Sequence, residues 1–172
     1  MSNSRISRRE LALLGAWAAQ AAQQTAAFRV LNSAEARELE AIAAEIIPSG
    51  DSPGAREAGC IYFIDRALET FDRDQRPLYR QGLAQAQATR RKLFPASHDI
   101  ASLEPADRIR LLQAIEKTDF FEAIRAHTIM GFYADPSYGG NRGQVGWKHI
   151  GYEPAHHYHS PFGYYDARKD AE

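Results

Sequence analysis

The stretch NSAEARELEAIAAEIIPS, residues 32–49, carries the signals of a complete amphipathic helix. Asn32 is followed three residues later by Glu35, the pattern of a capping box in which two side chains satisfy the first backbone N–H groups of a helix. Pro48 is a residue at which a helix ends. Apolar side chains recur between these signals at helical spacing, at Leu39, Ile42, Ala43, Ile46 and Ile47. The stretch predicts a helix with one apolar face, which must pack against other elements.

Four further segments show the same periodicity, at 55–71, from 77, from 105 and at 119–133. Pro77 and Pro105 suit the first turn of a helix, and Arg90, Arg91 and Lys92 suit the last turn of the helix that Pro77 starts. No alternating strand pattern is evident, so the sequence predicts an all-α fold, a small helical bundle. The side chains expected in its core are Ile61, Ile64, Leu68, Phe71, Leu78, Leu83, Ala86, Ile109, Leu112 and Ile115 or Leu111, Phe120, Phe121, Ile124 and Ile129.

The helical periodicity stops near residue 134, and a long Gly- and aromatic-rich C-terminal loop region is expected from there. The stretch GFYADPSYGGNRGQVGWKHIGY, residues 131–152, holds six of the 12 glycines of the chain and five aromatic residues. Ordering glycine is entropically costly, and large rings are costly to leave in water. Such a stretch is therefore expected to be ordered by contact with another surface.

Composition excludes several classes of function. The 172 residues have a formal net charge of −1, which leaves no basic surplus for phosphates, so no nucleic-acid partner is expected. Cys60 is the only cysteine, which excludes an intrachain disulfide and a multi-cysteine metal site. We expect Cys60 to be a small buried apolar residue.

The first residues have the layout of an export signal. Arg5, Arg8 and Arg9 precede an apolar run over 11–19, and the sequence AQA at 19–21 offers small residues to a signal peptidase. The pair Arg8 and Arg9, within SRRELAL, resembles a twin-arginine translocation signal, although an ordinary amphipathic helix is an alternative. We expect a signal segment over 1–27, a single helical domain over 28–172, and a periplasmic location with only indirect contact with the membrane.

Standard catalytic motifs are missing from the sequence. It contains no dinucleotide-binding glycine fingerprint, P-loop, GxSxG elbow or HExxH pair. We therefore expect no catalytic residue and no cofactor in this chain. His156, His157 and His159 could bind a metal, but their spacing is not that of a helical ligand pair, and a solvated tail is favoured. His98 and His127 are expected to have structural roles, and Glu116, Asp119 and Glu122 to form a solvated helix face.

Two longer stretches resemble a known family. They are EAIAAEIIPSGDSPGAREAGCIYFID, residues 40–65, and FFEAIRAHTIMGFYADPSYGGNRGQVGWKHIGY, residues 120–152, and they are similar to the gluconate 2-dehydrogenase subunit 3 family. The positions that match its hallmark pattern are Pro136, Tyr138, Gly139, Gly140, Asn141, Gly143, Trp147 and Gly151.

The resemblance implies an accessory subunit. In such complexes a large FAD-dependent flavoprotein of the glucose–methanol–choline type oxidises a sugar, polyol or sugar acid, and a cytochrome c subunit or another acceptor takes the electrons. The small subunit supplies the export signal and supports the folding or flavin loading of its partner.

Within this interpretation, the Gly- and aromatic-rich stretch is the expected contact with the flavoprotein, since aromatic residues and arginine dominate interface hot spots. The predicted interface residues are Tyr133, Asp135, Pro136, Tyr138, Asn141, Arg142, Trp147 and Tyr152. Three alternatives stay open: the stretch caps the helical bundle of its own chain, the histidine cluster makes the protein a metal binder or metal-dependent enzyme, or Tyr138, Trp147 and Tyr152 bind a sugar.

Overall fold

The computed structural model describes residues 27–154, and these residues are all-α, as the sequence predicts. The predicted signal segment and the histidine cluster at 156–159 lie outside the described residues. The α-helices are α2 (Ser33–Ile46), α3 (Cys60–Glu69), α4 (Arg76–Leu93), α5 (Pro105–Ile115), α6 (Asp119–Tyr133) and α7 (Val145–His149). Short 3-10 turns occur at η1 (Arg73–Gln75), η2 (Pro136–Tyr138) and η3 (Arg142–Gln144).

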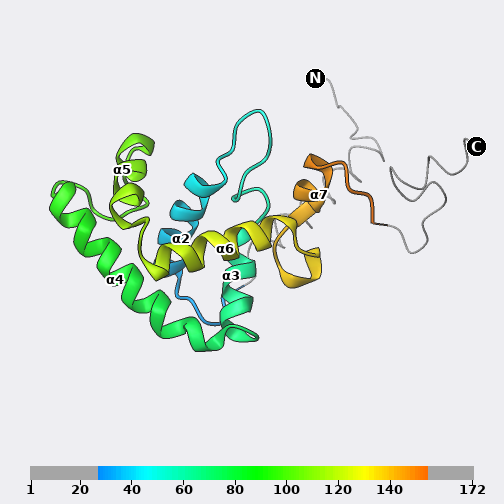
Figure 1. Ribbon diagram of the computed structural model, residues 1–172, viewed down its shortest axis with the longest axis horizontal. Helices are drawn as coiled ribbons and strands as arrows, with labels where there is room; N and C mark the ends of the chain where they lie inside the picture. Colours follow the sequence, from blue (N-terminus) through cyan, green and yellow to red (C-terminus); the bar gives the residue numbers. More distant parts are fainter. Residues whose placement is uncertain (1–26, 155–172) are drawn as a thin grey trace, which may run out of the picture.

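Helix α6 is the centre of the arrangement, because it packs against α2, α3, α4 and α7 (Figure 1). The long α4 and the shorter α5 form one end of the molecule, and α7 lies beyond the C-terminal end of α6 at the other. The main core lies between α2, α3, α4, α5 and α6, and its fully buried members include Ile42, Ile64, Leu111 and Ile124. A smaller cluster, with Cys60 and Phe132, lies under the Gly-rich segment.

Helix α2 begins as its sequence predicts. The side chain of Asn32 accepts hydrogen bonds from the backbone of Ala34 and Glu35, and the Glu35 carboxylate accepts one from the Asn32 backbone at 3.0 Å. Helix α2 ends at Ile46, two residues before Pro48. The capping box and the proline therefore fix both ends of this helix locally.

The prediction of burial is wrong for three residues. Phe71 is 54% exposed because α3 ends at Glu69, so the helical register does not continue to it. Ile109 is 46% exposed because α5 turns Arg108, Leu111 and Leu112 inward instead. Ile129 is 39% exposed because the other face of α6, which carries Gly131, packs against α3 and the Gly-rich segment. The other predicted core residues are buried or pack against the core cluster.

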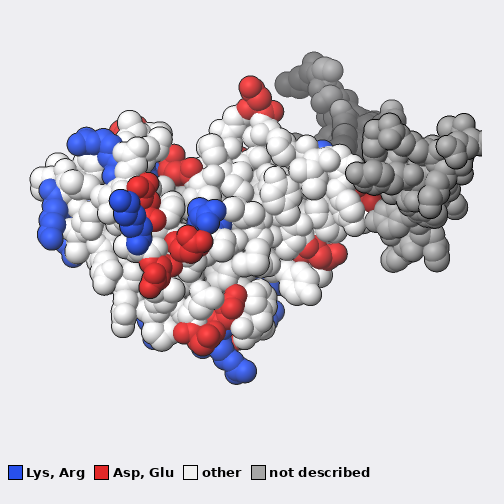
Figure 2. Space-filling model, in the orientation of Figure 1, with Lys and Arg blue, Asp and Glu red and all other residues white. Residues whose placement is uncertain are grey.

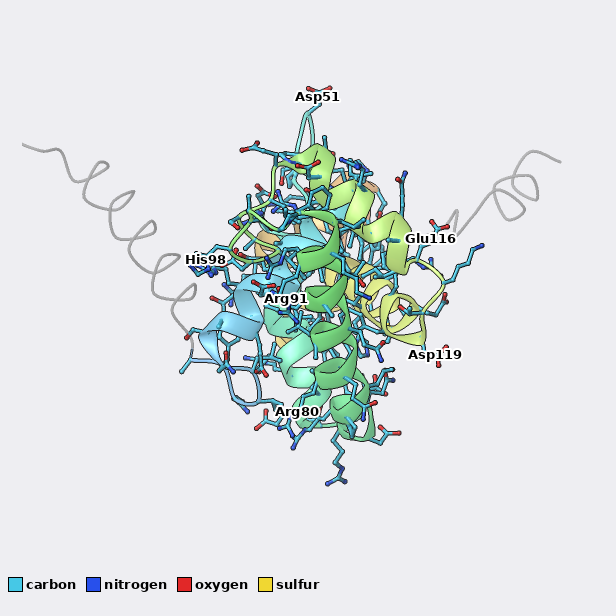
Figure 3. The ribbon with its side chains drawn as sticks, turned by 90° about the vertical axis from the view of Figure 1, so that its left-hand side faces the viewer. Asp51, Arg80, Arg91, His98, Glu116 and Asp119 are labelled. Atoms are coloured by element: carbon cyan, nitrogen blue, oxygen red, sulfur yellow. The ribbon has the colours of Figure 1, made fainter. Side chains whose placement is uncertain are left out.

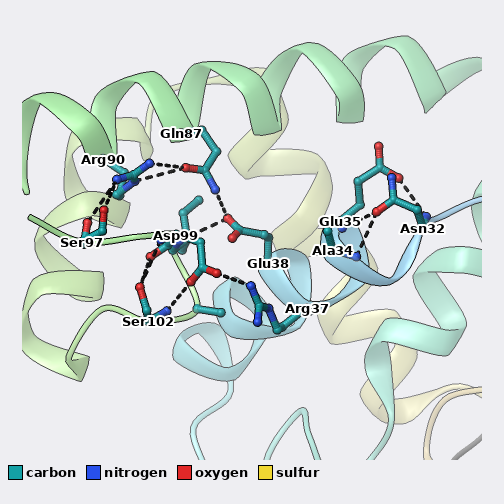
Figure 4. A network of polar contacts seen from close by, with 12 residues as sticks. Asn32, Ala34, Glu35, Arg37, Glu38, Gln87, Arg90, Ser97, Asp99 and Ser102 are labelled. Atoms are coloured by element: carbon teal, nitrogen blue, oxygen red, sulfur yellow. Dashed lines mark hydrogen bonds and ion pairs between the residues drawn. The ribbon is translucent and has the colours of Figure 1, made fainter. Parts of the chain in front are cut away.

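A polar network ties α2 to α4 and to the 97–102 turn (Figure 4). The carboxylate of Glu38, which is buried, accepts hydrogen bonds from the Gln87 amide and from the Ile100 backbone N–H. Burial raises the pKa of Glu38 above its usual value despite these bonds. Next to it, Arg37 pairs with Asp99. The network therefore holds one carboxyl group in a place that disfavours its charge.

A second polar group lies in the centre of the bundle. His127 on α6 is 2% exposed, and its Nδ1 is 2.7 Å from the Tyr79 hydroxyl of α4. Its Nε2 is 2.8 Å from the Asp72 carboxylate, just before η1. Burial and the charge of Asp72 raise the pKa of Tyr79. His127 therefore has the structural role that the sequence predicts, with both ring nitrogens satisfied.

Candidate functional site

Residues 134–154 are more ordered than the predicted loop. Three short helical pieces, η2, η3 and α7, follow one another and fold back on the end of α6 and the start of α3. The periodicity of the sequence gave no sign of them because each has only three to five residues. The expected contact with another surface is thus made, in part, by the chain itself.

Two glycines allow this close packing. A Cβ atom on Gly140 would lie 2.1 Å from the Gly131 carbonyl oxygen, and one on Gly146 would lie 2.0 Å from the Phe132 carbonyl oxygen. No side chain fits at such distances, so the segment approaches α6 backbone to backbone. The unusual glycine content therefore has a packing reason within this chain.

Asn141 fastens the segment from inside. Its backbone N–H donates to the Gly131 carbonyl at 2.7 Å, and its side-chain amide donates to the Ala134 carbonyl at 2.9 Å. Its side-chain oxygen accepts from the Gly146 N–H at 2.9 Å. Asn141 is 0% exposed with φ at 45°, a left-handed conformation that asparagine tolerates well. Among the predicted interface residues, Asn141 therefore offers no side-chain surface to a partner and serves the fold of this chain.

Trp147 forms a second fastening at the surface. Its indole Nε1 donates to the Tyr133 carbonyl at 2.7 Å, and its ring meets that of Tyr152 edge-on, with 5.2 Å between the centroids. Trp147 is half-buried, whereas Tyr133 and Tyr152 are 40% and 43% exposed. The indole therefore links the last residue of α6 to Tyr152, which follows α7.

The remaining predicted interface residues lie on the side of α3. The Asp135 side chain accepts from the Ser137 N–H at 2.9 Å, and hydrogen bonds from Ser137 keep the pKa of Asp135 below its usual value. Pro136 is half-buried at the start of η2, and Tyr138, at its end, is 55% exposed. The guanidinium of Arg142 lies over the ring of Tyr62, 3.6 Å from its centroid.

Large apolar side chains stand exposed around this segment. Of the nine such side chains that are exposed within residues 27–154, six occur between 129 and 152. We call this set, defined by its stretch of sequence, the apolar face: Ile129, Met130, Tyr133, Tyr138, Ile150 and Tyr152. In the view of Figure 2, charged side chains gather over α4, α5 and the start of α6, and few lie near the end of α6 and α7. Exposed apolar groups concentrated in this way mark interaction sites.

Ile129 belongs to this face although the sequence predicts it in the core, and Met130 and Ile150 were not predicted as interface residues. Their exposure depends on how the Gly-rich segment covers α6, which the helical periodicity does not encode. Tyr62 was also missed, because its contact with Arg142 joins residues 80 positions apart.

Within 27–154, no three His, Cys, Asp or Glu side chains come together as a metal site requires, and no helix is long and apolar enough to cross a membrane. Glu116 and Asp119 point into solvent (Figure 3), as predicted for a solvated helix face, and His98 is also exposed. Cys60 is completely buried, as predicted, and burial raises its pKa to about 12.

Comparison with known protein families identifies the family of this chain. The family model described as gluconate 2-dehydrogenase subunit 3 matches residues 33–154, which includes the six α-helices of the described residues, α2 to α7, and the Gly-rich segment. Comparisons with curated proteins and with solved structures find no significant match. The family match covers well over half of the chain and confirms the resemblance seen in the two long stretches. This chain belongs to the gluconate 2-dehydrogenase subunit 3 family.

Proposed function

We propose that this chain is the non-catalytic small subunit of a periplasmic FAD-dependent dehydrogenase that oxidises a sugar, polyol or sugar acid. Its partner is a large flavoprotein of the glucose–methanol–choline type, which holds the FAD, and a cytochrome c subunit is a further component. The small subunit escorts the flavoprotein through twin-arginine export, using Arg8 and Arg9, and supports its folding or flavin loading. Membership of a dehydrogenase-subunit family supports this assignment.

The apolar face is the observation that carries the proposal. Tyr138 and Ile150 are more than half exposed, yet both lie on a segment that is fixed to α6 by backbone contacts and by Asn141. Exposed rings on a fixed support bind with little loss of conformational entropy. A surface of this kind fits a protein partner, and the fixed segment acts both as a cap on its own bundle and as a docking surface.

The test is co-expression with a glucose–methanol–choline flavoprotein that lacks its own export signal. With the full chain present, we expect the flavoprotein to reach the periplasm, to hold FAD in a 1:1 ratio, and to co-purify with the small subunit. The double substitution Arg8→Lys and Arg9→Lys should stop export but leave the complex intact in the cytoplasm. A flavoprotein that is exported and filled with FAD equally well without this chain would refute the proposal.

Surface variants separate docking from folding. Replacing Tyr138 and Ile150 by serine should abolish co-purification and leave the thermal unfolding of the isolated chain unchanged, because neither side chain is buried. The matched control is Ile109→Ser, which removes an apolar residue of α5 that is 46% exposed and does not belong to the apolar face. Loss of the complex with the control alone would place the contact elsewhere.

A further inference from the structure

Three side chains from distant parts of the sequence form one stack on the outer side of α3. The ring of Phe28 lies parallel to that of Tyr62, with 5.1 Å between the centroids and 18° between the planes. The guanidinium of Arg142 also lies over the Tyr62 ring, 3.6 Å from its centroid. Tyr62 thus joins the first described residues of the chain to the Gly-rich segment.

The segment that carries Phe28 is held firmly. We call residues 27–31 the strap. The buried carboxylate of Asp65 accepts hydrogen bonds from the backbone N–H groups of Arg29, Val30 and Leu31 at 2.8, 3.0 and 2.9 Å. The Arg29 side chain pairs with Glu69 at 2.8 Å. The two carboxylates on this side of α3 are therefore both occupied by groups of the strap.

Arg142 is fixed from the other side. Its backbone N–H donates to the Ala58 carbonyl at 3.0 Å. Gly59, with φ at 66°, leaves room for its side chain, because a Cβ atom there would lie 2.6 Å from Arg142 Cδ. The strap, Tyr62 and Gly59 together define where the guanidinium sits, so little rotamer entropy is left to lose on binding.

Among the described residues, the guanidinium edges have no acceptor. Among residues 27–154, no carboxylate pairs with Arg142, and its only side-chain interaction there is the stacking on Tyr62. Stacking occupies the face of a guanidinium and leaves its N–H groups, which point outward in the plane, able to grip a carboxylate with two hydrogen bonds. Arg66, one turn after Tyr62, donates to the Ser137 carbonyl at 2.6 Å and adds a second positive charge nearby.

We propose that Arg142, held on Tyr62 by the strap and the Gly-rich segment, binds a carboxylate of the flavoprotein at the edge of the apolar face. This rests on the proposed function and names the chemistry of the partner at one contact. Tyr138, which is exposed next to Gly139, lies on the same side, where a Cβ on Gly139 would be 3.0 Å from Arg66 Cδ. The apolar face supplies contact area, and Arg142 supplies the direction and register of docking. Because the strap backs the stack, the chain that follows the export signal also helps to form the docking surface.

The test measures the affinity of the full chain for the co-expressed glucose–methanol–choline flavoprotein by biolayer interferometry. Arg142→Lys retains the charge but loses the flat fork, and we expect Kd to rise about tenfold or more, as for loss of a charge-assisted hydrogen bond. Tyr62→Leu, which leaves the arginine but removes its support, should produce a similar loss. The control is Arg125→Lys, since Arg125 is exposed on α6 and pairs only with Glu122 among the described residues.

The salt dependence identifies the carboxylate. Binding of the wild-type chain should weaken more steeply between 0.05 and 0.5 M NaCl than binding of Arg142→Gln, because one ion pair is screened in the first case and absent in the second. Equal affinity of the wild-type and Arg142→Lys chains, or identical salt dependence of the wild-type and Arg142→Gln chains, would overturn this inference while leaving the proposed function standing. A wild-type chain that does not bind the flavoprotein at all would overturn both.

Discussion

Gly140→Ala is the sharpest test of how the Gly-rich segment is held. The new Cβ atom would lie 2.1 Å from the Gly131 carbonyl oxygen, whereas 3.0 Å is the closest approach that real Cβ atoms make. The segment must therefore move by at least 0.9 Å, the difference between these two distances. The same carbonyl accepts the Asn141 N–H at 2.7 Å, so a movement of this size takes that hydrogen bond to about 3.6 Å, too long to be one.

The expected cost has two parts. Overpacking of a tight contact costs about 1–3 kcal/mol, and a buried donor and acceptor left unpaired cost about as much again. We expect the free energy of unfolding to fall by about 2–6 kcal/mol, which lowers Tm by about 4–24 °C in a chain of this size. Urea and thermal unfolding followed by circular dichroism measure both quantities.

Gly50→Ala is the matched control, since a Cβ atom at Gly50 would meet nothing within 4 Å. We expect this change to alter the unfolding free energy by no more than about 0.5 kcal/mol. If Gly140→Ala unfolds at the same urea concentration as Gly50→Ala, the segment is not packed tightly against α6, and the apolar face has no fixed support.

Three further predictions concern the buried polar groups. Because burial raises the pKa of Glu38, the folded protein holds the proton of this carboxyl more tightly than the unfolded chain does, so stability should fall as pH rises from 4.5 through the raised pKa. The urea midpoint of Glu38→Gln relative to that of the wild type should therefore increase between pH 4.5 and 7.5. A constant or shrinking difference between the two midpoints would contradict this. His127→Leu should lower the free energy of unfolding by about 1–3 kcal/mol, because it leaves the Tyr79 hydroxyl unpaired. The double variant His127→Leu and Tyr79→Phe should lose less stability than the sum of the two single changes. Additive losses in a double-mutant cycle of urea unfolding would argue against the buried contact. Cys60, with its pKa raised to about 12, should not react with a disulfide thiol reagent at pH 8 until urea unfolds the chain, and rapid labelling of the folded protein would show that the thiol is accessible.

Local signals in the sequence were sufficient to predict the five longer helices, α2 to α6, but not α7 or the start of α3 at Cys60. The capping box of Asn32 and Glu35, the two prolines at helix starts and the apolar spacing all act within one or two turns, so they are visible in a single stretch. The errors arise where a helix ends early or where another segment decides which face is covered. Phe71 and Ile129 are examples, since the first lies beyond the end of α3 and the second on the side of α6 that the Gly-rich segment leaves open.

The composition of residues 131–152 predicted that this segment is ordered by contact with a surface, but it did not predict which contacts it makes. The docking role of the segment and the kind of partner stay predictions from the family resemblance. The sequence predicts both Asn141 and Tyr138 as interface residues, yet Asn141 is fully buried and Tyr138 is 55% exposed. Asn141 is buried because carbonyl groups at the end of α6 accept its hydrogen bonds. In the same way, the stack with Phe28 and Tyr62 determines where Arg142 lies. Such long-range contacts cannot be read from spacing along the chain.

We propose above that this chain acts by docking a flavoprotein through the apolar face. Hydrogen exchange of the full chain, measured with and without the co-expressed glucose–methanol–choline flavoprotein, tests it most directly. We expect the partner to slow exchange at residues 129–152 and in the strap, and to leave exchange in α4 and α5 unchanged. Slower exchange confined to α4 and α5, or no change anywhere at saturating partner, would contradict it.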